Sequence, residues 1–372
     1  MHSRDHCRCQ KCVNQDTMQR AFDTFQITPD VEPKEVVTER DGLRVTWGYD
    51  GISDGHVSLY PWEWLKKQGL SSQSQELSQE NLDLYLWDKS INLEEPVVHY
   101  DEIMSHEKGV GEWTAKIRKY GFCYVEGCPV SPEKTERLLE RIAFIRITHY
   151  GGFYDFTSDL TMKDMAYTSL ALGAHTDTTY FTDPAGLQMF HLLSHTEGTG
   201  GASLLVDGFN AAHRLRQESP ESWDILRAVP ILWHASGNEG ITITPSHRFP
   251  VLGINSNVGT GSTHGIEGLL QIRWNNDDRG LVPVRENDPI SATKWYEAAR
   301  KFDAILKEDD MQYWAQLKPG RPLIFDNWRV LHGRSAFSGK RRICGGYVNH
   351  DDFISRWRNT NFPREVALSQ IL

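Results

Sequence analysis

The run RPLIFDNWRVLHG, residues 321–333, is largely apolar and strand-like, and its next-to-last residue is a histidine. Short runs of the same kind recur between residues 170 and 350, and glycine, proline or polar turns separate many of them. They are GLQMFHLL, GASLLVDG, ILWHAS, LLQIRWNN and RICGGYVN. Many short strands with few helices are typical of a sandwich or a jelly roll and argue against a doubly wound sheet. These runs therefore predict a mainly β fold with flanking helices.

Two segments carry clear helix signals. SPEKTERLLERIAFI, residues 131–145, begins with Ser131 as a candidate N-cap and has Pro132 at the first helical position. ATKWYEAARKFDAILKE, residues 292–308, is the one helix expected among the strand-like runs of residues 170–350. We expect both helices to flank the β fold.

The first 95 residues differ in character from the rest of the chain. GLRVTW, residues 42–47, is a strand-like run of apolar and β-branched residues. Residues 66–95 are polar and rich in serine, glutamine and glutamate, which is typical of a linker. We predict a small N-terminal β domain over residues 1–70, a linker over 71–95 and a large domain over 96–372.

The composition and net charge of the chain argue against some classes of binding partner. The chain has 372 residues and a formal net charge of −10, which argues against a nucleic-acid surface and gives no reason to expect an anionic membrane partner. It has no run of about 18 apolar residues for a transmembrane helix, and its start lacks the apolar region of a signal peptide. We expect a cytoplasmic protein, or a mitochondrial one if the sequence begins late.

Three of the six cysteines lie close together near the start of the chain, as Cys7, Cys9 and Cys12. Without a secretory signal a disulfide framework is a poor interpretation, and metal binding is the better one. Thiolates at this density favour zinc, which takes four tetrahedral ligands. A fourth ligand is expected from nearby chain.

The segment GAHTDTTYF, residues 173–181, suggests a second metal site. In a strand, residues two apart point the same way, so His175 and Asp177 can place an imidazole and a carboxylate on one face. His332, at the end of the run at 321–333, supplies a third candidate ligand. Two imidazoles and one carboxylate make a facial triad, which leaves open positions on a ferrous ion.

Basic residues follow this last histidine closely. Arg334, Arg341 and Arg342 lie in HGRSAFSGKRRICGGY, and arginine can bind the carboxylate of an acidic co-substrate in a bidentate manner. The alternative is a surface basic cluster, which suits Lys340 and Arg342 better than Arg341.

Several long motifs resemble those of the trimethyllysine dioxygenase and γ-butyrobetaine hydroxylase family. They are HTDTTYF, GTGGASLLVDGF, RWNNDDR, LKPGRPLIFDNWRVLHGR and CGGY, and the similarity runs from the N-terminus to about residue 350. The resemblance implies a double-stranded β-helix, which is a jelly roll, in a homodimer. It also implies hydroxylation with Fe(II), O₂ and 2-oxoglutarate, yielding succinate and CO₂, with ascorbate as the reductant. Members usually have a strand before the RDHC motif, so we expect either that the sequence begins late or that the small domain is trimmed at its start.

The resemblance also implies roles for individual residues. His175, Asp177 and His332 are the implied iron ligands, Arg341 binds the far carboxylate of 2-oxoglutarate, and Arg334 supports it. His56 is the implied fourth zinc ligand beside Cys7, Cys9 and Cys12, with His2 and His6 as competitors.

The implied substrate carries a trimethylammonium group, which cannot donate a hydrogen bond and is recognised by aromatic faces. The resemblance places four tyrosines in such an aromatic cage: Tyr150, Tyr154, Tyr167 and Tyr347. Tyr154 stands where the family usually has tryptophan, and tyrosine keeps the π face.

The other end of the substrate distinguishes the two branches of the family. Asp164 lies eleven residues before His175, where the γ-butyrobetaine branch looks to have asparagine. A carboxylate suits the α-ammonium of trimethyllysine and would repel a bare carboxylate. Asn275 can hydrogen-bond the same polar end.

The expected function is therefore hydroxylation of Nε-trimethyllysine, a small cationic amino acid, at C3 in carnitine biosynthesis. One alternative is a γ-butyrobetaine hydroxylase or the hydroxylase of a related betaine. A second alternative, from another class, is a non-catalytic binding module built from a zinc domain and a jelly roll.

Overall fold

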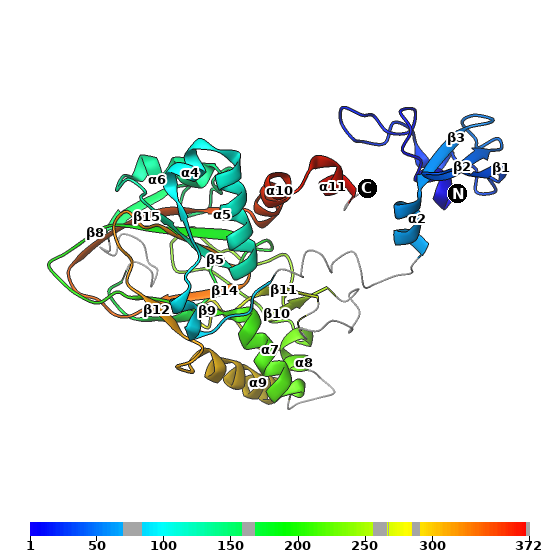
Figure 1. Cartoon of the computed structure of the whole chain (residues 1–372). Helices are drawn as coiled ribbons and strands as arrows, with labels where there is room; N and C mark the ends of the chain where they lie inside the picture. Colours follow the sequence, from blue (N-terminus) through cyan, green and yellow to red (C-terminus); the bar gives the residue numbers. More distant parts are fainter. Residues whose placement is uncertain (70–83, 158–167, 256–265, 267, 285–290, 370–372) are drawn as a thin grey trace. The chain divides into compact units, whose positions relative to one another are not determined.

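The computed structural model describes residues 1–69, 84–157, 168–255, 266, 268–284 and 291–369. The chain divides into two compact units, residues 1–75 and residues 76–372 (Figure 1). Within the described ranges, none of the helices has the length and apolar character needed to cross a membrane.

The first unit is a small antiparallel sheet. Its strands pair in the order β1 (Pro33–Thr38), β2 (Gly42–Trp47) and β3 (Val57–Pro61), and α2 (Trp62–Gly69) follows. The predicted strand GLRVTW is β2. Val45, Trp47 and Tyr60 are among the five buried residues of the core. A core of this size contributes little stability by itself, and small domains of this kind usually depend on a metal or a disulfide for additional stability.

Two sheets form the framework of the second unit. The six-stranded sheet has the order β4 (Val97–His99), β5 (Phe122–Glu126), β13 (Leu323–Asp326), β8 (Leu187–Thr196), β15 (Lys340–Val348) and β6 (Tyr154–Thr157). The four-stranded sheet has the order β12 (Tyr313–Ala315), β9 (Ser203–Asp207), β14 (Val330–Arg334) and β7 (Leu172–His175). A further pair, β10 (Leu252–Ile254) with β11 (Leu269–Ile272), lies outside both sheets.

The two sheets enclose a common core, as a jelly roll requires. The core includes Phe122, Phe325 and Leu192 from the six-stranded sheet, and Leu205 and Val330 from the four-stranded one. The mainly β fold, with its jelly-roll domain and small N-terminal β domain, is confirmed.

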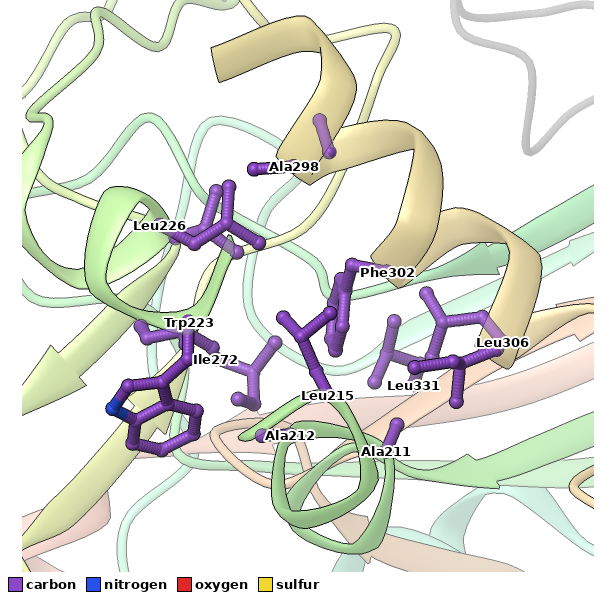
Figure 2. Packing of buried hydrophobic residues seen from close by; sticks show 14 of the residues in the cluster. Ala211, Ala212, Leu215, Trp223, Leu226, Ile272, Ala298, Phe302, Leu306 and Leu331 are labelled. Atoms are coloured by element: carbon purple, nitrogen blue, oxygen red, sulfur yellow. The ribbon is translucent and has the colours of Figure 1, made fainter. Parts of the chain in front are cut away.

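Helices cover each sheet on its outer side (Figure 1). The six-stranded sheet packs against α4 (Tyr100–Ser105), α5 (Glu107–Tyr120), α6 (Pro132–Glu140) and α10 (His350–Asn361), and α11 (Arg364–Ser369) follows α10 in the chain. The four-stranded sheet packs against α7 (Gly208–Glu218), α8 (Pro220–Ala228) and α9 (Ser291–Leu306). Figure 2 shows the packing of these three helices on the four-stranded sheet. Leu215 of α7, Leu226 of α8 and Phe302 of α9 belong to one buried cluster, and Leu331 of β14 is part of it.

The helices and strands predicted from the sequence were right for most elements and wrong for some. Ser131 caps α6 by accepting a 3.3 Å hydrogen bond from the backbone N–H of Lys134, but the helix ends at Glu140 instead of running to residue 145. The run ILWHAS makes only isolated bridges, because its partners are single residues of loops. Residues 170–350 contain three helices among those described, α7, α8 and α9, where one was expected.

The segment expected to be a linker lies partly within the folded core. Residues 71–83 lie outside the described residues. Further on, Trp87 and Ile91 are buried in the core between the two sheets, and the ring of Trp87 packs edge-on against that of Phe122 at 5.2 Å. The second unit therefore includes these residues.

Candidate active site

Three candidate metal ligands converge at one edge of the four-stranded sheet. His175 is the last residue of β7 and stands opposite His332 of β14 in the antiparallel register. Asp177 follows in the next turn. Its Oδ1 lies 3.3 Å from His175 Nε2 and 3.7 Å from His332 Nε2. The pairing of the two strands thus brings together residues that are far apart in the sequence.

The donor set fits a ferrous ion. One ligand atom from each of the three side chains lies within 4.8 Å of the others. Burial, and next the neighbouring His175, lower the pKa of His332 to about 3, so its imidazole is neutral and able to bind a metal. Burial opposes the charge of Asp177, but His332 and His175 hold its pKa below the usual range. Burial opposes the charge of His175, but the adjacent Asp177 raises its pKa above the ordinary value. Two imidazoles and a carboxylate are the typical ligand set of non-haem iron oxygenases.

The turn after His175 is held by buried threonine hydroxyls, to which sequence reasoning gave no role. Thr176 Oγ1 accepts a 3.0 Å hydrogen bond from the backbone N–H of Trp274. Thr178 has φ +56°, uncommon for a β-branched residue, and its Oγ1 accepts from Ala185 N at 2.8 Å. These contacts give Thr176 and Thr178 a structural role in the turn.

Asn327 and Arg273 also hold this turn, and sequence reasoning missed both. Asn327 accepts a 2.7 Å hydrogen bond from the backbone N–H of Asp177 and donates one of 3.0 Å to its carbonyl. Arg273 is 3% exposed and donates to the carbonyls of Thr179, Phe181 and Thr182. In the sequence, each of these two residues could have been noticed as a polar side chain within an otherwise apolar, strand-like run.

A cavity of about 1270 Å³ opens beside the triad. Its lining includes most of the functional residues that were predicted from the sequence. They are His175, Asp177, His332, Arg334, Arg341, Tyr150, Tyr154, Tyr347 and Asn275. The predictions for Asp164 and Tyr167 fall outside the described residues.

The arginines near the cavity differ in their surroundings. Arg341 of β15 is 2% exposed, and its Nε has no hydrogen-bond partner among the described residues. Burial, and next Arg334, lower its pKa to about 10, which leaves it charged at neutral pH. Arg342 instead lies at the surface and donates to both carboxylate oxygens of Asp155. A buried guanidinium bordering a cavity is suited to bind a carboxylate there.

Arg334 holds the cavity wall. It donates to the carbonyl of Leu170 at 3.3 Å and to the carbonyl of Thr168, and its guanidinium lies 5.3 Å from the ring centre of Phe337. Arg341 lies 5.5 Å from the same ring. Arg334 therefore supports the backbone that leads into β7.

Three of the four predicted cage tyrosines border the cavity. The rings of Tyr154 and Tyr347 lie 6.0 Å apart at 69°, and the Tyr154 hydroxyl donates to the carbonyl of Met189 at 2.8 Å. Tyr150 packs on the ring of His149 at 3.9 Å. Burial, and next the charge of Asp177, raise the pKa of Tyr347 well above its ordinary value, so this phenol keeps its proton.

Asp278 also borders the cavity and was not predicted. Its Oδ2 accepts hydrogen bonds of 2.9 Å from Thr179 Oγ1 and from Asn275 Nδ2. Asn275 is thereby fixed in orientation. In the sequence, the acidic pair Asp277 and Asp278 at the end of RWNNDD could have indicated this residue.

The small first unit contains a separate cluster of metal-ligating side chains. His56 Nε2 lies 3.3 Å from Cys7 Sγ, 3.8 Å from Cys9 Sγ and 3.5 Å from Cys12 Sγ. The buried Arg4 donates to Cys12 Sγ at 3.3 Å and to Asp50 at 2.7 Å. Three thiols and an imidazole fit a tetrahedral structural zinc, and the buried guanidinium compensates thiolate charge.

The competing histidines of the first unit do not join this cluster. The metal-ligating groups there are the three cysteines and His56, without His2 or His6. His6 Nδ1 is hydrogen-bonded to the carbonyl of His2 at 2.9 Å.

Comparison with known proteins gives two family matches and a series of relatives. Residues 3–66 match the family model "Gamma-butyrobetaine hydroxylase-like, N-terminal", and residues 87–347 match "Taurine catabolism dioxygenase TauD, TfdA family". A trimethyllysine dioxygenase of Neurospora crassa is 51% identical, with 99% of this chain and 81% of that protein covered. The mitochondrial trimethyllysine dioxygenase of Homo sapiens is 38% identical, with 95% and 80% covered.

A relative from the other branch is more distant. The gamma-butyrobetaine dioxygenase of Pongo abelii is 25% identical, with 95% of this chain and 89% of that protein covered. The identity to both trimethyllysine dioxygenases, over nearly the whole chain, exceeds this value. The chain belongs to the trimethyllysine dioxygenase family within the TauD/TfdA dioxygenases.

Proposed function

We propose that the chain hydroxylates Nε-trimethyllysine at C3 in a reaction that depends on Fe(II) and 2-oxoglutarate. The observation that carries this proposal is the triad of His175, Asp177 and His332, open to a cavity that also holds the buried Arg341. Membership of the trimethyllysine dioxygenase family supports the choice of substrate. Ferrous iron supplies the activation of O₂ that hydroxylates an unactivated carbon, while 2-oxoglutarate is decarboxylated to succinate.

The protein side of this reaction consists of binding and positioning. The side chains of His175, Asp177 and His332 would hold the iron. Arg341 binds the far carboxylate of 2-oxoglutarate, which replaces the hydrogen bonds that its Nε lacks in the described structure. Arg334 holds the adjoining backbone in place.

The trimethylammonium group binds among aromatic rings. Tyr150, Tyr154 and Tyr347 border the cavity, and Tyr167 completes the proposed cage. Each cation–π contact contributes on the order of 0.5–2 kcal/mol. At the other end of the substrate, Asp164 and Asn275 bind the α-ammonium and carboxylate groups.

The proposed function is tested by comparing two betaines. With Fe(II) and 2-oxoglutarate, succinate release is expected to have a kcat/KM at least about tenfold higher for trimethyllysine than for γ-butyrobetaine, because a lost charge pair costs more than about 1.4 kcal/mol. Higher kcat/KM for γ-butyrobetaine would show that the role given to Asp164 is wrong. If neither betaine supported succinate release, the chain would not be this oxygenase.

Zinc is the proposed occupant of the cluster in the first unit, with a structural role. Replacing Cys12 with serine removes one of the four proposed zinc ligands, and the small core around Trp47 does not replace the lost free energy. We expect the variant to lose its one zinc per chain and the segment 1–75 to become sensitive to protease. Metal analysis and limited proteolysis measure both.

Cys128→Ala is the matched control for the zinc cluster, because Cys128 is a buried thiol of the second unit. It should keep the zinc and the protease resistance. Full zinc content in Cys12→Ser would show that the cluster is not the zinc site.

A further inference from the structure

The two oxygens of the Asp177 carboxylate have different surroundings. Oδ1 faces the two imidazoles, at 3.3 Å from His175 Nε2 and 3.7 Å from His332 Nε2. Oδ2 accepts two hydrogen bonds of 2.7 Å, one from Gln188 Nε2 and one from the hydroxyl of Tyr347. One oxygen is thus directed to the metal position while two donors hold the other.

These donors come from the rigid centre of the larger sheet. Gln188 of β8 and Tyr347 of β15 stand directly opposite each other in the antiparallel register, so their side chains lie on one face. Gln188 is 2% exposed and Tyr347 is 6% exposed. Strand β8 has a partner on each side, β13 and β15. Asp177 itself lies in a turn, and it is therefore held by side chains that have little freedom to move.

The hydrogen bonds decide how this carboxylate can bind a metal. A free carboxylate rotates and can offer one oxygen or both to a cation. Two donors on Oδ2 fix that rotation and occupy the lone pairs of this oxygen, which leaves Oδ1 as the ligand. Hydrogen-bond partners of this kind orient a ligand before the metal arrives, and their loss typically weakens metal binding.

Tyr347 has a second contact that separates the functions of its ring and its hydroxyl. Its ring borders the cavity beside the ring of Tyr154, at 6.0 Å. Its hydroxyl points instead to Asp177. One side chain therefore borders the proposed cage with its π face and touches a metal ligand with its polar end.

We propose that Gln188 and the Tyr347 hydroxyl are positioning residues that hold Asp177 as a monodentate ligand, and that they thereby set the affinity of the triad for a divalent metal. The inference rests on the proposed function, because it takes the triad as the metal site. In this arrangement, the ring of Tyr347 acts on the trimethylammonium group and its hydroxyl acts on Asp177.

The experiment removes the hydroxyl and keeps the ring. Mn(II) is titrated into the 372-residue chain after loading with zinc, and binding is followed by electron paramagnetic resonance, in which zinc gives no signal. Tyr347→Phe should bind Mn(II) about 10–100-fold more weakly than the wild type, with an altered spectrum of the bound ion. Its KM for trimethyllysine should change little, because the π face remains.

Tyr154→Phe is the matched control. It also removes one tyrosine hydroxyl beside the cavity, but that hydroxyl donates to the carbonyl of Met189 and not to Asp177. Its Mn(II) affinity should equal that of the wild type. Gln188→Met is the second test variant, since methionine has similar length and cannot donate, and it should also weaken Mn(II) binding. Thermal unfolding midpoints show whether each variant is folded.

The outcomes separate this inference from the proposed function. If folded Tyr347→Phe and Gln188→Met bind Mn(II) as the wild type does, while His332→Ala does not, the positioning role is overturned and the metal site stands. If Tyr347→Phe loses affinity for trimethyllysine alone, the hydroxyl acts on the substrate and the inference is overturned too. Wild-type binding no stronger than that of His332→Ala would overturn both the inference and the proposed iron site.

Discussion

Replacing His332 with alanine is expected to abolish turnover of 2-oxoglutarate and trimethyllysine, with a loss of at least about 10³-fold, which corresponds to about 4 kcal/mol in the activation free energy. His332 supplies one of only three proposed protein ligands, and its neutral imidazole lies 3.7 Å from the carboxylate oxygen of Asp177. Two ligands hold a ferrous ion weakly, so the variant loses iron. Succinate release and Mn(II) titration measure the two effects.

The control for this prediction is the other metal site. Zinc content should stay at one ion per chain in His332→Ala, because the ligands proposed for zinc lie in the first unit. His106→Ala, which removes an exposed histidine at the start of α5, should retain turnover. Loss of zinc in His332→Ala would show that the two metal sites have been confused, and retained turnover would exclude His332 as an iron ligand.

Replacing Arg341 with methionine is expected to raise the KM for 2-oxoglutarate by about 150-fold, which corresponds to about 3 kcal/mol. The guanidinium is buried and still charged, and its removal deprives the far carboxylate of 2-oxoglutarate of its proposed partner. Arg341→Lys should recover only part of the affinity, because an ammonium cannot bind a carboxylate with the planar fork of arginine. Steady-state kinetics with each substrate varied in turn measure the effect.

The neighbouring arginine provides the matched control for Arg341. Arg342→Met removes the same group from the surface, where it pairs with Asp155, and should leave the KM for 2-oxoglutarate unchanged. A surface ion pair of this kind contributes about 0–1 kcal/mol to stability. If Arg341→Met raised the KM for trimethyllysine and not that for 2-oxoglutarate, Arg341 would contact the substrate instead.

Local patterns predicted the elements whose formation depends on adjacent residues. The run GLRVTW is β2, and Ser131 caps α6 through a hydrogen bond that spans three residues. Helix α7 was missed because its N-cap, Asp207, is also the last residue of β9, so no loop separates strand from helix. The buried ion pair of Asp207 with Arg329, at 2.8 Å, joins residues that are remote in sequence.

His175, Asp177 and the three clustered cysteines could be selected from the sequence because their spacing and chemical type are local properties. His175 and Asp177 are two residues apart at the end of a strand, and the three cysteines lie within six residues. For His56 and for the specific role of Arg341, the resemblance to a known family was needed, because many histidines and arginines were available. The substrate assignments at Asp164 and Tyr167 still stand as predictions.

By itself, the sequence determined the β-rich class and the chemical types of the candidate metal ligands, and it predicted an arginine that binds a carboxylate. Only the tertiary structure decided that the run RPLIFDNWRVLHG is two strands, with β13 in one sheet and β14 in the other. Asn327 lies at the bend between them and bonds Asp177, 150 residues away, while Tyr347 reaches the same aspartate across 170 residues. The physical reason is that periodicity and capping act over a few residues, whereas strand order and side-chain packing determine which distant polar groups meet.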